Sequence, residues 1–226
     1  MDWHPGLAPD TVTVLWCTTD GDERRRARAL LLGTAAEMLG VRSSEIWLEH
    51  EPGGRPFLGG AGRTLRVSVA HARGALAVAL TAAAPVGVDV EVVRALRADA
   101  LARAWLHEDE AAWLGGVPEA DRSAAFLWLW TQKEAVGKAL GLGLRAGGMG
   151  RRVPVAAHWP PDGEEMPAPR ALPDSPGVAS AAVLVDGKRH VIGVAVGDGA
   201  DGGRGGGPGA RGVRVRVRRV ASVPAG

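Results

Sequence analysis

Hydrophobic and polar residues alternate in several short stretches of this chain, a pattern that is typical of β-strands. The clearest case is residues 85–93, PVGVDVEVV, where valines occupy every second position from residue 86. Longer stretches repeat their apolar residues at intervals of three and four, which predicts amphipathic helices. The pattern predicts strands within 11–16, 45–58, 64–80, 85–93, 153–157, 178–185 and 189–196, with two strands in 64–80. It predicts helices at 22–40, 95–114 and 122–140, the last one ended by Gly141 and Gly143.

A strand, a helix and further strands follow one another twice along the chain, with a break near residues 93–100. This order predicts an α+β fold with two halves of similar size, residues 1–94 and residues 95–197. A cleft between two such halves is a common place for a ligand. We therefore expect the functional site in the cleft between the halves.

Two stretches do not fit a regular element of the core. Residues 158–177 hold six prolines, which exclude a central strand there. Residues 198–226 form a Gly/Arg-rich tail, and its low-complexity part, 197–212, is predicted to be disordered because it has too little apolar surface to bury. Residues 213–220, VRVRVRRV, alternate again, either as an edge strand with arginines in solvent or as a free basic arm. We favour the edge strand, because charged edges oppose association between strands.

The distribution of charge narrows the possible partners. The whole chain has a net charge of +2, but residues 199–226 carry six arginines and one aspartate, so the remainder is negative. A basic stripe for nucleic acid is therefore not expected on the body of the protein. No apolar run reaches the ~20 residues needed to cross a bilayer, no signal peptide is recognisable, and Cys17 is the single cysteine. We expect a cytoplasmic protein without disulfides.

Two carboxylates stand out on the strand predicted at 85–93. Asp89 and Glu91 are two residues apart, so they share one face of a strand at a spacing of about 7 Å. The pair is consistent with a solvent-facing edge whose valines turn inward. The strand alone favours this interpretation, and a binding site for a metal ion is the alternative that the rest of the chain must decide.

A second acidic element lies on the helix predicted at 122–140. Trp130, Glu134 and Lys138 are spaced by four residues and share a helix face, which also suits a plain surface ion pair. Together, the strand D-x-E and the helix K-E-x-x-x-K supply three carboxylates and two lysines. Three carboxylates suit a hard cation such as Mg²⁺, and the lysines would offset the charge of bound phosphates. Such a set of carboxylates and lysines is suited to phosphoryl transfer. No GxxxxGK[ST] motif is present, so the site is not a P-loop nucleotide site.

These motifs resemble those of a known family. GVDVE (87–91) followed by WTQKEAVGKALGLGL (130–144) is similar to the paired motifs of the 4'-phosphopantetheinyl transferases, in their larger, Sfp-like branch. GGRPFL (53–58) and VSVAHARG (67–74) resemble two weaker blocks of the same family, in the right order. The resemblance covers roughly residues 12–196. It implies a pseudo-two-fold α+β protein, each half a mostly antiparallel sheet packed with helices, with the active site in the cleft between the halves.

The resemblance also implies an activity and a set of site residues. Family members transfer the phosphopantetheine arm of coenzyme A to a serine of an apo acyl- or peptidyl-carrier protein and release 3',5'-ADP. Asp89, Glu91 and Glu134 would hold Mg²⁺ against the pyrophosphate. Lys138 would bind the phosphates and could stabilise or protonate the departing ADP. Glu134 or a metal-held water would take the serine proton.

Further residues match family positions with less specific roles. Glu110 matches an acid sometimes regarded as the base, although an exposed helix carboxylate is an equally good interpretation. Arg55 and His71 match positions that contact the 3'-phosphate and adenine of coenzyme A. Within the arginine cluster at 24–28, Arg28 is the first choice for a phosphate contact. The sequence departs from the family at Ala70 and Ala72, where serines are common, in a short segment before residue 24, and in the tail.

Other functions remain open from the sequence. One is a different Mg²⁺-dependent enzyme acting on phosphoanhydrides, such as a hydrolase or a nucleotidyl transferase. Another is a degenerate, non-catalytic family member that still binds coenzyme A. A third is a binding protein tethered to nucleic acid by the arginine tail. For the favoured function we expect coenzyme A and a carrier protein as partners, no membrane, no nucleic acid, and a monomer.

Overall fold

The computed structural model describes residues 10–142, 149–198 and 212–221. Its first part contains β1 (Thr11–Thr18), α1 (Glu23–Leu39), β2 (Ile46–His50), β3 (Pro56–Gly60), β4 (Arg66–Ala72) and β5 (Ala75–Thr81), with short 3-10 turns at Ser43–Glu45 and Ala61–Thr64. The rest contains β6 (Val86–Val92), α2 (Ala98–Trp105), α3 (Glu108–Gly115), α4 (Arg122–Ala139), β7 (Arg170–Leu172), β8 (Ser175–Val185), β9 (His190–Gly197) and β10 (Arg214–Arg219), with a 3-10 turn at Glu119–Asp121. The fold is α+β, as predicted.

The two main sheets repeat one topology. The first sheet has the order β10-β1-β5-β4 and the second has the order β6-β9-β8-β7. In the first sheet β1 pairs antiparallel with β5, which pairs antiparallel with β4, and in the second sheet β6 pairs antiparallel with β9, which pairs antiparallel with β8. Helix α1 lies between β1 and β4 along the chain, and helices α2, α3 and α4 lie between β6 and β8. The predicted pair of similar α+β units is thus visible in the strand order.

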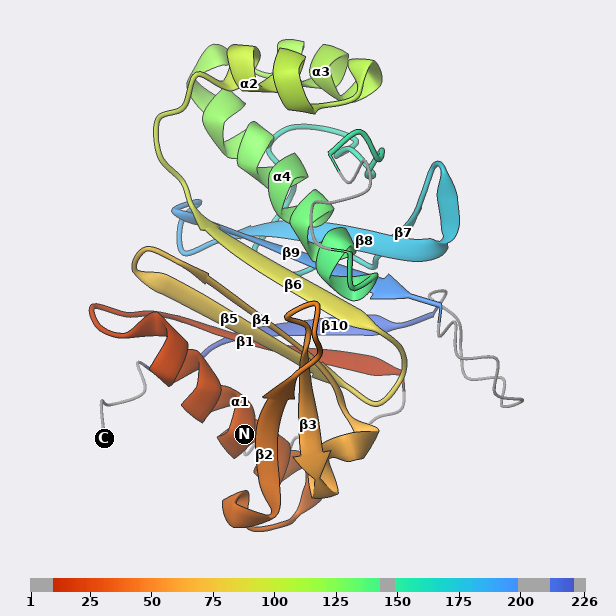
Figure 1. Ribbon diagram of the computed structural model, residues 1–226. Helices are drawn as coiled ribbons and strands as arrows, with labels where there is room; N and C mark the ends of the chain where they lie inside the picture. Colours follow the sequence, from red (N-terminus) through yellow and green to blue (C-terminus); the bar gives the residue numbers. More distant parts are fainter. Residues whose placement is uncertain (1–9, 143–148, 199–211, 222–226) are drawn as a thin grey trace.

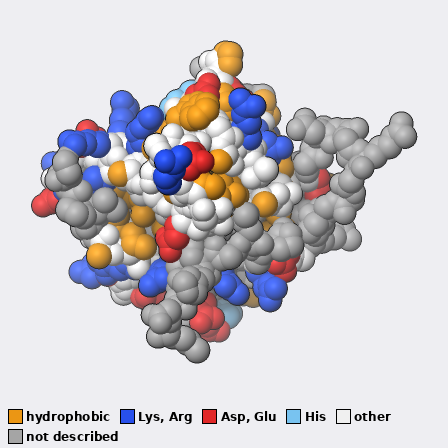
Figure 2. Space-filling model, turned by 90° about the horizontal axis from the view of Figure 1, so that it is seen from below, with side chains coloured by type: hydrophobic (Ala, Val, Ile, Leu, Met, Phe, Trp, Pro, Cys, Tyr) orange, Lys and Arg blue, Asp and Glu red, His pale blue; other side chains and the backbone are white. Residues whose placement is uncertain are grey.

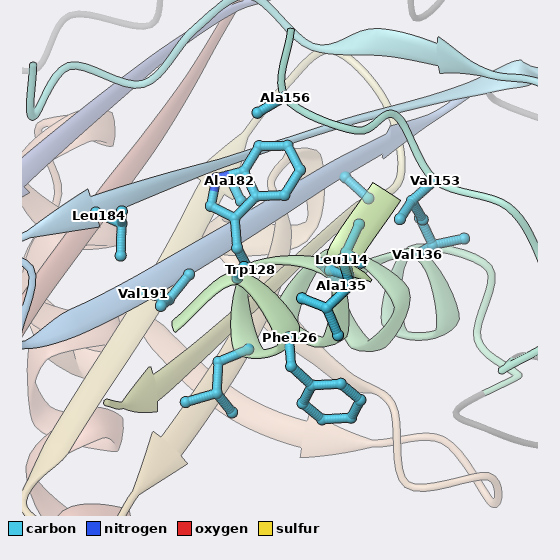
Figure 3. Close-up of a cluster of buried hydrophobic side chains, with 14 of the residues drawn as sticks. Leu114, Phe126, Trp128, Ala135, Val136, Val153, Ala156, Ala182, Leu184 and Val191 are labelled. Carbon is cyan, nitrogen blue, oxygen red and sulfur yellow. The ribbon is translucent and has the colours of Figure 1, made fainter. Parts of the chain in front are cut away.

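The units stack in layers, with the two sheets face to face between helices (Figure 1). Valines of β1, β6 and β9 meet in the core between the sheets, with Trp16 at its margin. Helix α1 covers the outer face of the first sheet through Ala27, Leu31 and Ala35. Helix α4 covers the outer face of the second sheet, and Figure 3 shows Trp128 of this helix lying beside Ala182 and Ala156.

Two glycines allow α4 to lie directly on the second sheet. A Cβ atom at Gly87 of β6 would come within 1.8 Å of the carbonyl oxygen of Ala135. A Cβ atom at Gly193 of β9 would come within 2.5 Å of the carbonyl group of Thr131. A side chain at either position would push the helix off the sheet, so these glycines set the distance between α4 and the carboxylate-bearing strand.

The single helix predicted at 95–114 is wrong, because two helices, α2 and α3, occupy this stretch. Helix α2 ends at Trp105 with Leu106 as its C-cap, and His107 begins α3 as its N-cap. Its Nδ1 accepts a hydrogen bond from the Asp109 N–H at 3.3 Å, and Glu110 accepts one from the His107 N–H at 3.0 Å. This capping box, followed by acidic residues in the first turn, starts a new helix.

The strand predicted at 153–157 is also wrong. The segment is extended, but its polar groups bond to side chains and not to a neighbouring strand. The Val153 N–H donates to Glu110, and the Pro154 carbonyl accepts from Gln132. Because Pro154 has no N–H to donate, a ladder through this position would be interrupted.

The prediction for the proline-rich loop holds up to Asp174 and is wrong at the end of the stretch. The strand β7, within 158–177, has three residues and lies at the edge of the second sheet, and β8 begins at Ser175. β8 lies between β9 and β7, so a central strand enters the stretch over its last three residues and includes Pro176.

The arginine-rich stretch near the end of the chain forms the predicted edge strand. β10 pairs with β1 in parallel, and the Val220 N–H donates to the Trp16 carbonyl at 2.9 Å. A free basic arm at 213–220 is therefore excluded. Most of the low-complexity part, residues 199–211, lies outside the described residues, as does Gly143.

The position of β6 bears on the predicted halves. The proposed division after residue 94 puts β6 in the first half, but its hydrogen bonds go to β9 of the second sheet. β6 also lies beside β4 at the junction, because the Val88 N–H donates to the Ser68 hydroxyl at 3.1 Å. The pairing favours a boundary before Val86.

Candidate active site

The paired motifs meet where α4 lies on β6. The Lys138 ammonium group donates to Oδ1 of Asp89 at 2.8 Å and to the Val88 carbonyl at 3.0 Å. Glu134 is one helical turn before Lys138 and is half-buried beside it. The close approach at Gly87 brings this face of the helix onto the strand. The predicted combination of a strand carboxylate with a helix lysine is therefore present as a direct contact.

The electrostatics of Asp89 are unusual for an aspartate. Its carboxylate is buried, and Oδ2 has no hydrogen-bond partner among the described residues. Burial raises the pKa of Asp89 from its ordinary 3.8 to about 7. The positive charge of Lys138 opposes this shift, while the charges of Glu134 and Glu91 add to it. The negative charges of Glu134 and Glu91 are therefore close enough to Asp89 to affect its ionisation.

Glu134 of α4 and Glu91 of β6 are the two other carboxylates near Asp89. Burial raises the pKa of Glu134, with Lys138 opposing and Glu91 adding to the shift. Glu91 is more exposed and pairs with Arg94 at 2.9 Å. Strand alternation turns Val88 and Val90 into the core between the sheets, which leaves Asp89 and Glu91 on the face toward α4. The pair is not a plain solvent-facing edge.

The residues fit a hard cation by chemistry more than by present geometry. Carboxylate oxygens are the ligands that Mg²⁺ prefers, and the unpartnered Oδ2 of Asp89 is a free ligand atom. However, within the described parts of the chain no three acidic, histidine or cysteine side chains are grouped closely enough to hold a metal. Lys138 occupies Oδ1 of Asp89, and Arg94 holds Glu91. A cation would have to draw the carboxylates together.

Arg55 reaches this site from the connection between β2 and β3. Its Nη2 donates to the carbonyl of Ala139 at 3.1 Å, next in sequence to Lys138. The carbonyl belongs to the last turn of α4, where unpaired carbonyls attract a cation. A guanidinium can hold a phosphate through two parallel hydrogen bonds, so Arg55 is well placed for the predicted phosphate contact.

His71 and Arg28 lie on the other side of β4, toward α1. His71 is exposed near the end of β4, three residues after Ser68, and so about 10 Å beyond the Ser68–Val88 hydrogen bond. The backbone N–H groups of Glu23 and Gly74 lower the pKa of Glu23, and the nearby His71 adds to this effect. Arg28 is exposed on α1, and no described hydrogen bond or ion pair joins it to β6 or α4. The structure brings Arg55 to the last turn of α4, next to Lys138, but it does not bring Arg28 there.

Glu110 is neither exposed nor open to a substrate. Its side chain is almost completely buried, and one oxygen lies 2.7 Å from the Lys133 ammonium group. The other accepts from the Val153 N–H at 2.8 Å. The interpretation as an exposed helix carboxylate is wrong, and the burial argues against a role as the base, which stays a prediction.

The expected role of Lys133 at the phosphates is also wrong. It was predicted to offset phosphate charge together with Lys138, but its side chain is fully buried on another face of α4. It donates to the carbonyls of Met149 and Arg151 at 2.9 and 2.6 Å, and burial lowers its pKa. Lys133 therefore ties α4 to α3 and to the segment that follows α4. The adjacent K-E pair was a usable signal, because neighbouring helix residues point about 100° apart.

A second ionic cluster was not predicted. At the turn between β8 and β9, the buried Asp186 carboxylate bonds to Arg189 at 2.7 Å and to Arg219 of β10 at 2.6 Å. Arg219 also lies over the Trp16 ring, 5.1 Å from its centre. A cavity of about 670 Å³ opens here, and no predicted site residue lines it. Asp186 follows a strand without any motif, so periodicity offered no signal for the cluster.

Comparison with known proteins supports the strand–helix pair. Residues 85–176 match the family model of the 4'-phosphopantetheinyl transferase superfamily. The match begins just before β6 and ends at the start of β8, so it contains Asp89, Glu91, Glu134 and Lys138. It covers less than half of the chain and does not include the upstream blocks around Arg55 and His71. No curated protein matches the chain.

The match gives a superfamily for this segment and nothing finer. Residues 85–176 form a segment of 4'-phosphopantetheinyl transferase type, and this points to a transferase. The Sfp-like branch stays a prediction. None of the described helices is long and apolar enough to cross a membrane.

Proposed function

We propose that this protein transfers the 4'-phosphopantetheine arm of coenzyme A to a serine of an apo carrier protein, with the help of Mg²⁺. The observation that carries the proposal is the contact between Lys138 and the buried carboxylate of Asp89, with Glu134 and Glu91 close enough to shift its pKa. Perturbed acids of this kind are typical of functional sites. The superfamily match over the same two elements gives the reaction class.

The proposed roles follow from position and charge. Asp89, Glu91 and Glu134 would hold Mg²⁺, which when bound neutralises phosphate charge and favours departure of the leaving group. Lys138 is the cation between β6 and α4, and it would hold the pyrophosphate once its bond to Asp89 is released. Arg55, at the end of the same helix, would hold a further phosphate.

The transfer itself exchanges one phosphorus–oxygen bond for another. The serine oxygen bonds to the phosphorus next to pantetheine, the bond from this phosphorus to the bridging oxygen breaks, and 3',5'-ADP leaves with the electron pair. Glu134 would take the serine proton through a carboxylate oxygen that the cation leaves free. Lys138 would donate a proton to the leaving phosphate or balance its charge.

The experiment is the intact mass of an apo acyl- or peptidyl-carrier protein after incubation with this protein, coenzyme A and Mg²⁺. We expect a gain of one phosphopantetheine arm, which requires Mg²⁺ and is lost in Glu134→Gln. Release of 3',5'-ADP without any gain on several carriers would favour a hydrolase. Binding of coenzyme A without release of 3',5'-ADP would favour a degenerate family member.

A further inference from the structure

Large hydrophobic side chains are unevenly placed on the surface. Among the described residues, those exposed to solvent are Trp47, Phe57, Trp105, Leu140 and Leu142. Trp105 ends α2, at the top of Figure 1, whereas the hairpin of β2 and β3 lies toward the bottom. The other four belong to this hairpin and to the turn that follows α4, and we name Trp47, Phe57, Leu140 and Leu142 the rim patch.

The hairpin holds its two aromatic side chains in a defined arrangement. Trp47 pairs with Gly59 and Glu49 pairs with Phe57, so Trp47 and Phe57 share one face. The indole covers Gly59, where a Cβ atom would come within 2.2 Å of its Nε1, and it donates to Glu49 at 2.5 Å. The opposite face is buried toward α1. These aromatics are fixed in solvent by the strand register.

The turn after α4 joins the patch to the candidate site. Gly141 has a left-handed φ of 70°, and the Leu142 N–H bonds back to the Gly137 carbonyl at 3.0 Å, which closes the helix. Leu140 and Leu142 flank this glycine and point to solvent. Arg55, from the tip of the hairpin, bonds to the Ala139 carbonyl in the same turn. Lys138 lies immediately before this carbonyl, so Leu140 and Leu142 border the site, and the hairpin carries Phe57 and then Trp47 away from it.

We propose that the rim patch is the docking surface for the apo carrier protein, an inference that rests on the proposed function. The acceptor serine belongs to a folded protein, which is too large to enter a site between β6 and α4. It must therefore rest on the rim while its serine reaches Lys138. Fixed aromatic and leucine side chains at the edge of a polar site are what a protein partner with an apolar surface buries. Figure 2 views the molecule from the hairpin end, where hydrophobic surface is exposed between charged groups.

The matched pair Trp47→Ala and Trp105→Ala tests the docking surface. Trp47 is 45% exposed and Trp105 is 49% exposed, so each substitution removes a similar exposed indole, at opposite ends of the molecule. We expect Trp47→Ala to raise the KM for the carrier protein by about tenfold, a size typical of an interface aromatic. The KM for coenzyme A and kcat should stay as in the wild type. Trp105→Ala should change none of these constants.

Leu142→Ser is a second variant that does not depend on the hairpin fold. We expect it to raise the KM for the carrier at least threefold, with an unchanged melting temperature. If the wild type modifies the carrier but Trp47→Ala and Leu142→Ser keep its KM, the docking proposal is wrong and the proposed function stands. If the wild type transfers nothing and does not bind coenzyme A, the proposed function fails. A concentration-dependent dimer lost in both variants would show instead that the patch joins two copies of this chain.

Discussion

At the scale of single residues, Asp89 is the centre of the site because it is buried with one oxygen unpartnered and the other bound to Lys138. A folded protein holds such a carboxylate at a cost unless a ligand compensates for it. The sequence predicted the pair Asp89 and Glu91 and its partner Glu134 from spacing alone. It could not predict which of the three would be buried, because burial depends on how α4 lies on the sheet.

The raised pKa of Asp89 predicts a pH-dependent effect of Asp89→Asn. The pKa is about 7 in the folded protein and about 3.8 in the unfolded chain, so the folded state holds a proton that the unfolded state has lost. The stability contributed by this proton is complete below pH 4 and is lost as the pH rises to 7, with a full size on the order of 4 kcal/mol. The asparagine variant does not lose it.

We therefore expect the unfolding free energy of Asp89→Asn, relative to the wild type, to rise between pH 4.5 and pH 8 in urea titrations. The exposed Glu165→Gln serves as the control and should show no such trend. Equal differences at both pH values would contradict the burial of an ionisable Asp89.

The buried pair of Lys133 and Glu110 predicts a coupling. Removing one partner in Lys133→Met or Glu110→Gln leaves the other buried and unpaired, which typically costs about 3–5 kcal/mol. The double variant should cost clearly less than the sum, as measured by urea unfolding in a double-mutant cycle. Additive losses would show that the two groups do not stabilise each other.

At the scale of elements, the site depends on the close packing of α4 against β6, which brings Lys138 to Asp89. Gly87→Ala places a methyl group where Ala135 already has its carbonyl oxygen, so the helix must move. We expect a loss of several kcal/mol in unfolding free energy, or no soluble protein, together with loss of coenzyme A binding. Gly33→Ala is the matched control, because nothing lies within 4 Å of its Cβ position on the exposed side of α1. Alanine should stabilise that helix by up to about 1 kcal/mol. Equal stability of both variants would contradict the close approach.

Most elements were predictable from periodicity, and the exceptions have physical causes. The strand 85–93 and the helix 122–140 have long, regular patterns, and both lie where predicted. The break between α2 and α3 depends on the capping role of His107, an uncommon N-cap residue. The segment 153–157 has a strand-like pattern, but its backbone partners are the side chains of Glu110 and Gln132. Such partners come from tertiary contacts that local patterns do not contain.

At the scale of the whole molecule, two similar units meet through their sheets, and β10 completes the first of them. The strand order explains why a repeated pattern of strand, helix and strands predicted two units. The same pattern did not predict that β6 pairs only within the second sheet, nor that Arg28 would lie on the far side of the first sheet from α4. These features depend on how the sheets stack, which follows from the shape of the shared core.

We expect removal of the edge strand β10 to lower stability without abolishing transfer. Val213 is buried in the core between the sheets, and Arg219 covers Trp16. Removing residues 213–226 should lower the melting temperature and shift the tryptophan fluorescence to longer wavelength, because Trp16 gains solvent. Phosphopantetheine transfer at low temperature should remain, since Asp89 and Lys138 belong to the other sheet and its helix. Loss of transfer with an unchanged melting temperature would contradict this division.

The central claim is that the acids of β6 and α4 perform phosphopantetheine transfer, and the most direct test compares two glutamates. The intact mass of an apo carrier protein would be followed over time with wild type, Glu134→Gln and Glu110→Gln, in the presence of coenzyme A and Mg²⁺. We predict transfer by the wild type, none by Glu134→Gln, and transfer by the folded fraction of Glu110→Gln. Transfer by Glu134→Gln at the wild-type rate, or abolished transfer in a fully folded Glu110→Gln, would contradict the account.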